Sequence, residues 1–524
     1  MEQKRYHSLD AMRGILMIMG IYFHIAFWYA EQGAWLLWFY TGTTHMFRMH
    51  SFFLISGFFG ALLLDRKGGA EMVRNRFKRL FLPLIILSHP VYLLTKTGEK
   101  YAESVINEDQ NFIDEMIKHF NSPWQFIAQG TDHLWFLYLL FVMSIFGYLM
   151  SKVLDLNVHH LKRIVGFIFK KPWLGILLIC FLYATLLTLL NIHKAQFGHI
   201  YGWFWFVNPG AIKGFIAFSF FYFWGWQLYY FRGQFENLRI GLYLKMYGAF
   251  FVIGGTLVWS LFHFGYPSPY DEWNYWYSKY LIKKKVTFLV DMSTEPVVAG
   301  EGEEPAVYLN ITPWSTPHGF KMEEIENNLW SYTMDLAPGE YTYKFRNGFY
   351  DNWGPPNWEN GDTLTLGGCG YGDNGPRKFR VIDKDLTLGV FCWSKCTDCL
   401  GGEVVTAFQD TSADWKQVMI SRGFIFLHNF VVPIYVMLTL ALFTRFCKEP
   451  SKMLRYISDS SYWIYIIHVA VIPFTGPIFY SKNLNLYLQF FLTSILTTTI
   501  CFLSYHYLVR KTFIGKFLNG KKFD

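Results

Sequence analysis

The chain contains 524 residues, of which 52% are apolar, 20% are aromatic and only 16% are charged. This composition indicates a membrane protein rather than a soluble one. The formal net charge is +8, and we expect a lipid bilayer, and no nucleic acid, to be the partner of the basic residues.

Hydrophobic runs near the length that crosses ~30 Å of hydrocarbon recur along the chain. The sequence predicts an all-α bundle of about ten transmembrane helices, at residues 11–30, 46–64, 80–95, 133–150, 173–191, 209–231, 243–264, 420–444, 459–479 and 484–508. The first run lacks an Ala-x-Ala site and carries Arg13 within it. We therefore expect it to be a span and not a cleaved signal peptide.

Positive charge gathers in alternate connections between these runs. The connections rich in Lys and Arg are 66–79, 152–171, 232–245 and 445–455, together with the tail 510–522. The opposite set is poor in them, and residues 96–132 hold three Lys against seven Asp or Glu. The positive-inside rule predicts that both termini are cytoplasmic, which an even number of spans also requires. The predicted location is a bacterial inner membrane.

Two ionisable residues lie inside the first predicted span. Arg13 and His24 are 11 residues apart, about three helical turns, so they share a face with Gly20, which lets another group approach closely. Because charge inside a membrane is costly, such residues point to function. We expect Arg13 to hold an anion and His24 to act in group transfer. The alternatives are a structural Arg13–Asp10 pair and a structural His24.

Residues 265–419 interrupt the hydrophobic pattern. They contain no spanning run, and residues 286–402 hold 17 Asp and Glu against 8 Lys and Arg. Short β-type runs at 286–291, 306–310, 330–334 and 341–345, separated by turn sequences, predict an immunoglobulin-like β-sandwich. The expected domains are the first part of a membrane domain at 1–264, an inserted all-β domain at 284–403 in the periplasm, and the last part of the membrane domain at 416–524.

Four cysteines lie in this insert, at Cys369, Cys392, Cys396 and Cys399. In a domain outside the cytoplasm they favour two disulfides, although the sequence cannot choose among three pairings. Zinc is the alternative, since two of the spacings are short. We favour the disulfides and expect no metal site.

Five motifs follow one another along the predicted membrane helices. They are Leu9-Asp10-x2-Arg13-x10-His24, His45-x-Phe47-Arg48-Met49-x2-Phe52-Phe53-x-Ile55-Ser56-Gly57-Phe58, Arg76-x2-Arg79-x3-Pro83, His133-Leu134-Trp135-Phe136-Leu137 and Ser461-x2-Ile464-Tyr465-x2-His468. The ordered set resembles the acyltransferase family 3 of integral membrane enzymes. Within that family the chain is similar to members that succinylate periplasmic glucans, whose connection at the position of the insert is short.

The resemblance implies a division of roles among the motif residues. His24 is the expected catalytic base for an acceptor hydroxyl, because an ordinary imidazole titrates near neutrality, and Arg13 is expected to act with it. The residues expected to bind the acyl-CoA donor are Arg48, Arg76 and Arg79, since Arg suits phosphate. The residues expected on the acceptor side, or in support of the site, are Ser56, His133, Trp135, Tyr465 and His468. No carboxylate that would orient His24 is evident.

The insert carries a second resemblance. The run Trp330-x3-Met334-x-Leu336-x-Pro338-Gly339-x-Tyr341-x-Tyr343-Lys344-Phe345, followed by Asn347-Gly348 and Trp353, resembles the carbohydrate-binding modules of starch- and glycogen-active enzymes. It implies that Trp314, Trp353 and Trp358 stack on sugar rings. The alternative is that some of these rings fill the core of the sandwich.

Together these features predict a membrane O-acyltransferase with no permanently bound cofactor. It would move a succinyl or acetyl group from cytoplasmic acyl-CoA to hydroxyls of a periplasmic or surface glucan. Two alternatives remain open at this stage: a transporter or flippase, and a catalytically inactive glucan-binding receptor.

Overall fold

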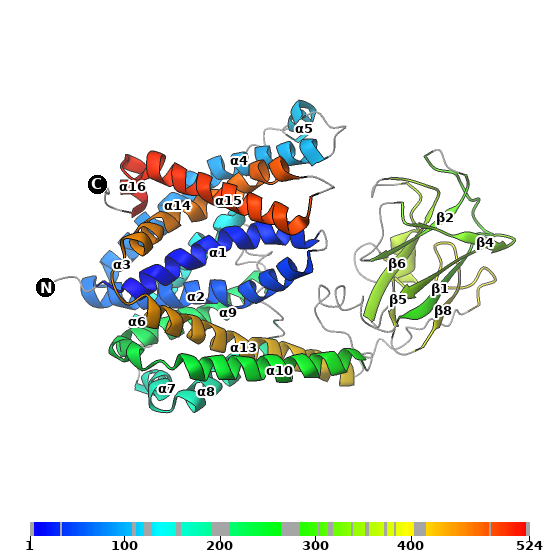
Figure 1. Ribbon diagram of the computed structural model, residues 1–524. Helices are drawn as coiled ribbons and strands as arrows, with labels where there is room; N and C mark the ends of the chain where they lie inside the picture. Colours follow the sequence, from blue (N-terminus) through cyan, green and yellow to red (C-terminus); the bar gives the residue numbers. More distant parts are fainter. Residues whose placement is uncertain are drawn as a thin grey trace. The chain divides into compact units, whose positions relative to one another are not determined.

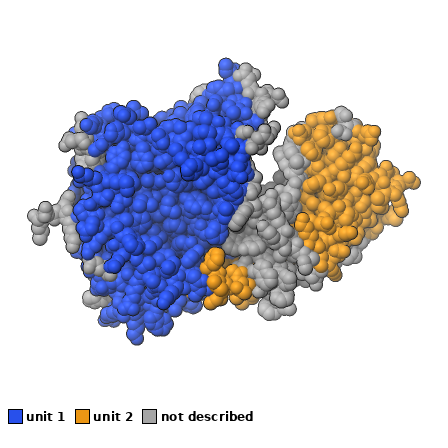
Figure 2. All heavy atoms as spheres, in the orientation of Figure 1, with its two compact units in different colours: residues 1–249, 425–524 blue, residues 250–424 orange. Residues whose placement is uncertain are grey.

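The computed structural model describes most of the chain, in two compact units. The described residues are 5–519 except 32–33, 107–111, 120–127, 129, 154–158, 191, 193–208, 264–282, 302–303, 313–317, 337–338, 352–355, 371–374, 382–383, 403–414 and 481–483. One unit comprises residues 1–249 and 425–524 and the other residues 250–424 (Figure 2). The first unit is helical and the second is mainly β (Figure 1).

Helices build the first unit. They are α1 (His7–Glu31), α2 (Trp35–Lys67), α3 (Gly69–Arg76), α4 (Leu82–Ile106), α5 (Phe112–His119), α6 (Trp135–Val153), α7 (His159–Lys170), α8 (Pro172–Leu189), α9 (Pro209–Leu228), α10 (Ile240–His263), α13 (Trp415–Phe446), α14 (Lys452–Thr475), α15 (Leu486–Ser504) and α16 (Phe513–Asn519). The boundaries with the second unit fall within two of them, α10 and α13. A π-helical turn, Phe77–Phe81, joins α3 to α4, and a 3-10 turn, Asp132–Leu134, precedes α6.

Among the described residues, nine helical segments are long and apolar enough to cross a membrane. The polytopic bundle predicted from the sequence is therefore confirmed. The predicted span 209–231 is helical as α9, which includes Lys213 and Gln227 and is not among these nine segments. Helix α9 instead buries its aromatic side chains in the bundle, including Phe218, Phe221 and Trp226.

Helices α2 and α9 pack backbone against backbone. A Cβ added to Gly57 on α2 would overlap the carbonyl oxygen of Tyr222, and one added to Gly225 on α9 would overlap that of Leu54. Small residues permit such close helix contacts in membranes. On the other side of the bundle, α1 lies against α2, α14 and α15 (Figure 1). This packing brings the motif-bearing helices α1, α2 and α14 together.

The second unit contains a sandwich of two four-stranded sheets. Its strands are β1 (Lys284–Asp291), β2 (Val307–Thr312), β3 (Phe320–Lys321), β4 (Glu323–Glu326), β5 (Leu329–Leu336), β6 (Gly339–Asn347), β7 (Arg377–Val381) and β8 (Leu386–Cys392). The strand orders are β4-β5-β1-β8 and β3-β2-β6-β7. Alternate residues of both sheets, such as Phe288 of β1, Leu309 of β2 and Phe345 of β6, form one buried core. The four predicted β-type runs lie in β1, β2, β5 and β6.

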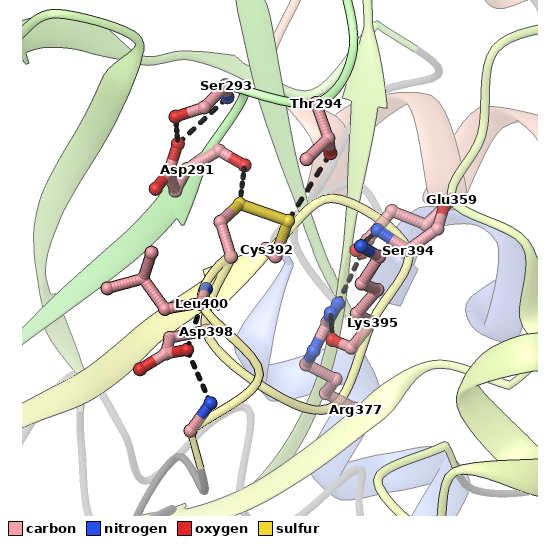
Figure 3. Close-up of a disulfide and its surroundings, with 12 residues drawn as sticks. Asp291, Ser293, Thr294, Glu359, Arg377, Cys392, Ser394, Lys395, Asp398 and Leu400 are labelled. Atoms are coloured by element: carbon pink, nitrogen blue, oxygen red, sulfur yellow. Dashed lines mark hydrogen bonds and ion pairs between the residues drawn. A yellow bond between two sulfur atoms is a disulfide. The ribbon is translucent and has the colours of Figure 1, made fainter.

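The four cysteines of this unit form two disulfides in the structure, Cys369–Cys396 and Cys392–Cys399. Figure 3 shows the second, with the hydroxyl of Thr294 3.3 Å from the sulfur of Cys392. The structure thus supports the disulfide interpretation over zinc. In the described part of the chain, no group of three or more His, Cys, Asp or Glu side chains is arranged to hold a metal ion.

A buried ion pair lies beside this disulfide (Figure 3). The carboxylate of Glu359 pairs with the guanidinium of Arg377, and both side chains are almost fully buried. Glu359 also accepts hydrogen bonds from the backbone N–H groups of Phe345, at 3.0 Å, and Ser394, at 3.2 Å. Arg377 donates to the carbonyl of Lys395 at 3.0 Å. These hydrogen bonds join the end of the sandwich to the disulfide-bonded loop.

Candidate active site

A cavity of about 330 Å³ lies inside the helical unit, bounded by α1, α2, α4 and α14 and by the start of α6. The motifs from these helices converge on it. The predicted site residues that line the cavity are His24, Arg48, His133, Trp135, Tyr465 and His468. Arg13, Ser56, Arg76 and Arg79 do not line it. The predicted site residues therefore fall into two groups, one that lines the cavity and one that lies outside it.

Three histidines form a row along one wall of the cavity. The ring centroids of His24 on α1 and His468 on α14 are 5.2 Å apart, and those of His468 and His133 are 5.7 Å apart. The Nε2 of His133 lies 2.9 Å from the carbonyl oxygen of Ile466. The hydroxyl of Tyr465 donates to the carbonyl of His133. These two bonds hold the start of α6 against α14.

The backbone of α14 determines the tautomer of His468. Its Nδ1 lies 2.8 Å from the carbonyl oxygen of Tyr465 and 3.0 Å from that of Ile464. Carbonyl oxygens only accept hydrogen bonds, so in neutral His468 the proton is assigned to Nδ1. Its Nε2 therefore carries a lone pair. This atom is buried and has no hydrogen-bond partner among the described residues.

Arg48 brings a positive charge into the same cavity. Its guanidinium carbon lies 4.6 Å from the centre of the Phe23 ring and its side chain is buried. It passes directly over Gly20, where a Cβ would overlap its Nη1 atom. The close approach predicted at Gly20 is thus that of Arg48. No acidic side chain of the described residues pairs with Arg48, so the cavity offers an uncompensated cation to an anion.

Sequence reasoning missed three polar side chains of the cavity wall. His45, Lys96 and Glu99 line it, and the Nζ of Lys96 lies 2.6 Å from the Oε2 of Glu99. The apolar run that predicted the third span ends at residue 95, but α4 continues to Ile106. The spacing of Lys96 and Glu99, three residues apart, is that of a helical ion pair and is the signal that could have extended the helix.

The remaining predicted arginines lie toward the other end of α1. Eleven residues of helix separate Arg13 from His24, about 16 Å along the axis. Arg13 donates to the hydroxyl of Ser458 at 2.9 Å and lies 3.7 Å from Asp10. The structural pairing of Arg13 with Asp10, left open by the sequence, is therefore present.

Arg76 and Arg79 are held by backbone carbonyls. Arg76 donates to the carbonyl of Ser56 at 3.5 Å, and Arg79 donates to that of Leu518 at 2.8 Å. The Nε of Arg76 is buried without a hydrogen-bond partner among the described residues. Ser56 thus contributes its backbone here and does not reach the cavity.

The tryptophans predicted to bind sugar lie in the second unit. Trp358 stacks one face on the guanidinium of Arg346, whose carbon lies 4.5 Å from the ring centre. Arg346 is also 4.6 Å from the ring of Tyr350. One face of Trp358 is therefore occupied within the domain. Trp314 and Trp353 lie outside the described residues, and sugar binding stays a prediction for all three.

A family model described as an acyltransferase domain matches residues 6–283, just over half of the chain. The protein belongs to acyltransferase family 3. It is a polytopic membrane acyltransferase, as the ordered motifs predicted. The match begins before Arg13 and includes the motif residues up to Trp135, which contribute His24, Arg48 and His133 to the cavity.

Among curated proteins the chain is similar to glucans biosynthesis protein C of Escherichia coli. It is 32% identical to that of strain SMS-3-5 over 154 residues, which cover 27% of this chain and 37% of the relative. It is 31% identical to that of strain K12 / DH10B, again over 154 residues that cover 27% of this chain and 37% of the relative. The chain thus aligns with little more than a third of these relatives. No solved structure gave a significant match, so the likeness of the sandwich to a carbohydrate-binding module stays a prediction.

Proposed function

We propose that this acyltransferase moves an acyl group from a coenzyme A thioester to a hydroxyl group of a glucan. The observation that carries the proposal is the cavity in which His24, His468 and the guanidinium of Arg48 meet, with no acidic partner for Arg48 among the described residues. A base and a cation that line one cavity are what acyl transfer needs, because a proton leaves the acceptor while negative charge develops on the carbonyl oxygen.

In this proposal His24 removes the proton of the acceptor hydroxyl. The oxygen then attacks the thioester carbonyl, and Arg48 stabilises the oxyanion that forms. A carboxylate at the far end of a succinyl group is a second anion that Arg48 suits. Both roles are consistent with a buried arginine that has no acidic partner among the described residues.

The separation of Arg13 from His24 along α1 suits the length of coenzyme A. Arg13, Arg76 and Arg79 would bind its phosphates, and its long pantetheine arm would carry the thioester some 16 Å along α1 to His24. By the positive-inside rule these arginines would lie at the cytoplasmic face of an inner membrane, on the side where coenzyme A is found. The β-sandwich would then lie in the periplasm and hold the glucan.

Purified full-length protein in lipid nanodiscs tests this function. It is incubated with succinyl-CoA or acetyl-CoA and a periplasmic glucan fraction, and both the released thiol and the mass of the glucan are followed. We expect thiol release that depends on the glucan, together with a glucan mass increase equal to one of the two acyl groups. Thiol release without a change in the glucan contradicts the proposed acceptor.

A further inference from the structure

We propose that His468 is the positioning residue of His24, and that its Nε2 accepts a hydrogen bond from the His24 ring. This inference rests on the proposed function and adds the group that orients the base. Many enzymes use a carboxylate for this purpose. Here a neutral histidine takes that place.

The cavity wall provides no free carboxylate for His24. Of the described residues that line it, Glu99 is the one acidic side chain, and it is paired with Lys96 at 2.6 Å. The group that does face His24 is the ring of His468, at a centroid distance of 5.2 Å. No hydrogen bond joins the two rings in this structure, but catalytic hydrogen bonds are often long before substrate binds and shorten in the substrate complex.

The direction of the hydrogen bond follows from the tautomer of His468. Two carbonyl oxygens, of Ile464 and Tyr465, accept hydrogen bonds from Nδ1–H at 3.0 and 2.8 Å. The buried Nε2 can then only accept. Among the described residues it has no hydrogen-bond partner, and a ring N–H of His24 is the donor that satisfies it. That bond leaves the other nitrogen of His24 as a lone pair for the substrate.

The charges around His24 make such an acceptor necessary. Arg48 and Lys96 line the same cavity as His24, and Lys96 is paired with Glu99 at 2.6 Å. A second positive charge on His24 is disfavoured beside the Arg48 guanidinium. The lone pair of His468 offsets part of this cost when His24 becomes an imidazolium, and the two carbonyls that bind Nδ1 strengthen that lone pair as an acceptor.

The transfer step balances with these two residues. The acceptor O–H bond breaks and its proton goes to the free nitrogen of His24, while the acceptor oxygen forms a bond to the thioester carbon. The C–S bond then breaks, and the thiolate of coenzyme A takes the proton from His24. His468 keeps its own Nδ1 proton throughout, so it positions the base and stabilises its charge without being consumed.

Two substitutions separate this role from a structural one. In His468→Asn the amide N–H can still donate to the carbonyls of Ile464 and Tyr465, but no acceptor reaches the position of Nε2. In His468→Gln the longer side chain places a carbonyl oxygen near that position. Both variants are reconstituted as full-length protein in nanodiscs, and thermal unfolding, kcat and KM are measured with acyl-CoA and glucan.

We expect His468→Asn to unfold at nearly the temperature of the unmodified protein and to lose about 100-fold in kcat, with KM values changed less than threefold. We expect His468→Gln to recover at least tenfold of that loss. A His468→Asn variant with normal kcat overturns the proposal. So does an equal loss of activity in both variants.

Solid-state nuclear magnetic resonance of the unmodified protein, labelled with nitrogen-15 in histidine, is an independent test that needs neither substrate nor variant. We expect neutral His468 to be protonated at Nδ1, with its Nε2 near a proton of His24. A proton on Nε2 of His468 overturns the proposal even if both variants fail to fold. If the unmodified protein transfers no acyl group, the proposed function fails, while this measurement still decides the His24–His468 contact.

Discussion

The guanidinium of Arg48 on α2 occupies the space that a side chain at position 20 of α1 would need. A Cβ at position 20 would therefore make the guanidinium of Arg48 shift from its present place in the cavity. Its charge is held there by the Phe23 ring, 4.6 Å away, and by no acidic side chain of the described residues. The apolar surroundings leave this charge available to a substrate anion.

Replacing Gly20 with Ala should displace Arg48 and lower activity by tenfold or more, because one donor to the developing oxyanion moves out of place. The measurement is kcat of the reconstituted enzyme with acyl-CoA and glucan. Gly248→Ala is the matched control, since nothing lies within 4 Å of a Cβ at this helical position. That control should raise stability slightly, by up to about 1 kcal/mol. Normal activity of Gly20→Ala would show that the position of Arg48 does not matter.

Replacing His24 with Ala should reduce acyl transfer by about 10²- to 10⁴-fold, the usual contribution of a general base. The protein should still insert and fold, because no described contact of His24 is a hydrogen bond that holds two helices together. Thiol release and thermal unfolding are measured side by side. His506→Ala is the control, because His506 is exposed and contacts Tyr456 well away from the cavity. Near-normal turnover of His24→Ala would make His24 structural.

Replacing both Arg76 and Arg79 with Gln should weaken acyl-CoA binding far more than glucan binding, because two cations that suit phosphate are lost. Isothermal titration with each substrate separates the two effects. Arg74→Gln is the control in the same segment, since Arg74 is exposed and 3.9 Å from Glu71. If the double variant binds acyl-CoA as well as the control does, these arginines only anchor the protein at the membrane surface.

The two disulfides should contribute unequally to stability. Cys369–Cys396 closes a sequence separation of 27 residues and Cys392–Cys399 one of 7. The chain-entropy model then gives about 3.5 and about 2.4 kcal/mol, respectively. Hydrogen exchange of the β1 and β8 peptides in full-length protein, with each cysteine pair changed to Ala, measures the difference.

All four cysteines of the insert should also resist alkylation until a reductant is added. Free reactivity of these thiols in cells would contradict the pairing.

The tryptophans of the sandwich should fall into two classes. Trp358→Ala should destabilise the domain, because Arg346 loses the ring on which it stacks at 4.5 Å. Trp314→Ala and Trp353→Ala should each weaken glucan binding by roughly fivefold to tenfold, which corresponds to about 1 kcal/mol per stacked ring. Titration of the full-length variants with long glucans and with short sugars tests this. Unchanged affinity in both variants would assign the sandwich another role.

The sequence was sufficient to bring His24, Arg48, His133 and His468 into one hypothesis, because each stands in a short motif of recognisable spacing. It could not show that Arg13 lies outside the cavity. Arg13 and His24 share a helix face, but the rise of the helix separates them by about 16 Å. It also could not assign the proton of His468, since that depends on two carbonyls of α14 and on which helix faces the other nitrogen.

Polar residues at the end of an apolar run were the second source of error. Lys96 and Glu99 lie beyond the hydrophobic part of α4, so they were expected in a loop. In the structure α4 continues through them to Ile106, and their ion pair lies on the cavity wall.

Strand β7 of the sandwich was not predicted, because it carries three basic residues, Arg377, Lys378 and Arg380. Buried pairing of Arg377 with Glu359 permits a strand there, and this pairing between distant segments is invisible in a local pattern.

The direct backbone contact between α2 and α9 holds one wall of the cavity in place. At Gly57 and Gly225 no side chains separate the two helices, so neither can slide without carbonyl oxygens colliding. Arg48 therefore lies on a helix whose position is fixed by its packing against α9. On α4, Gly98 lies against Phe474 and Pro473 of α14, and Lys96 and Glu99 on the cavity wall are held by their ion pair. The wall that carries Arg48 should accordingly act as a fixed template for the size of the acyl group.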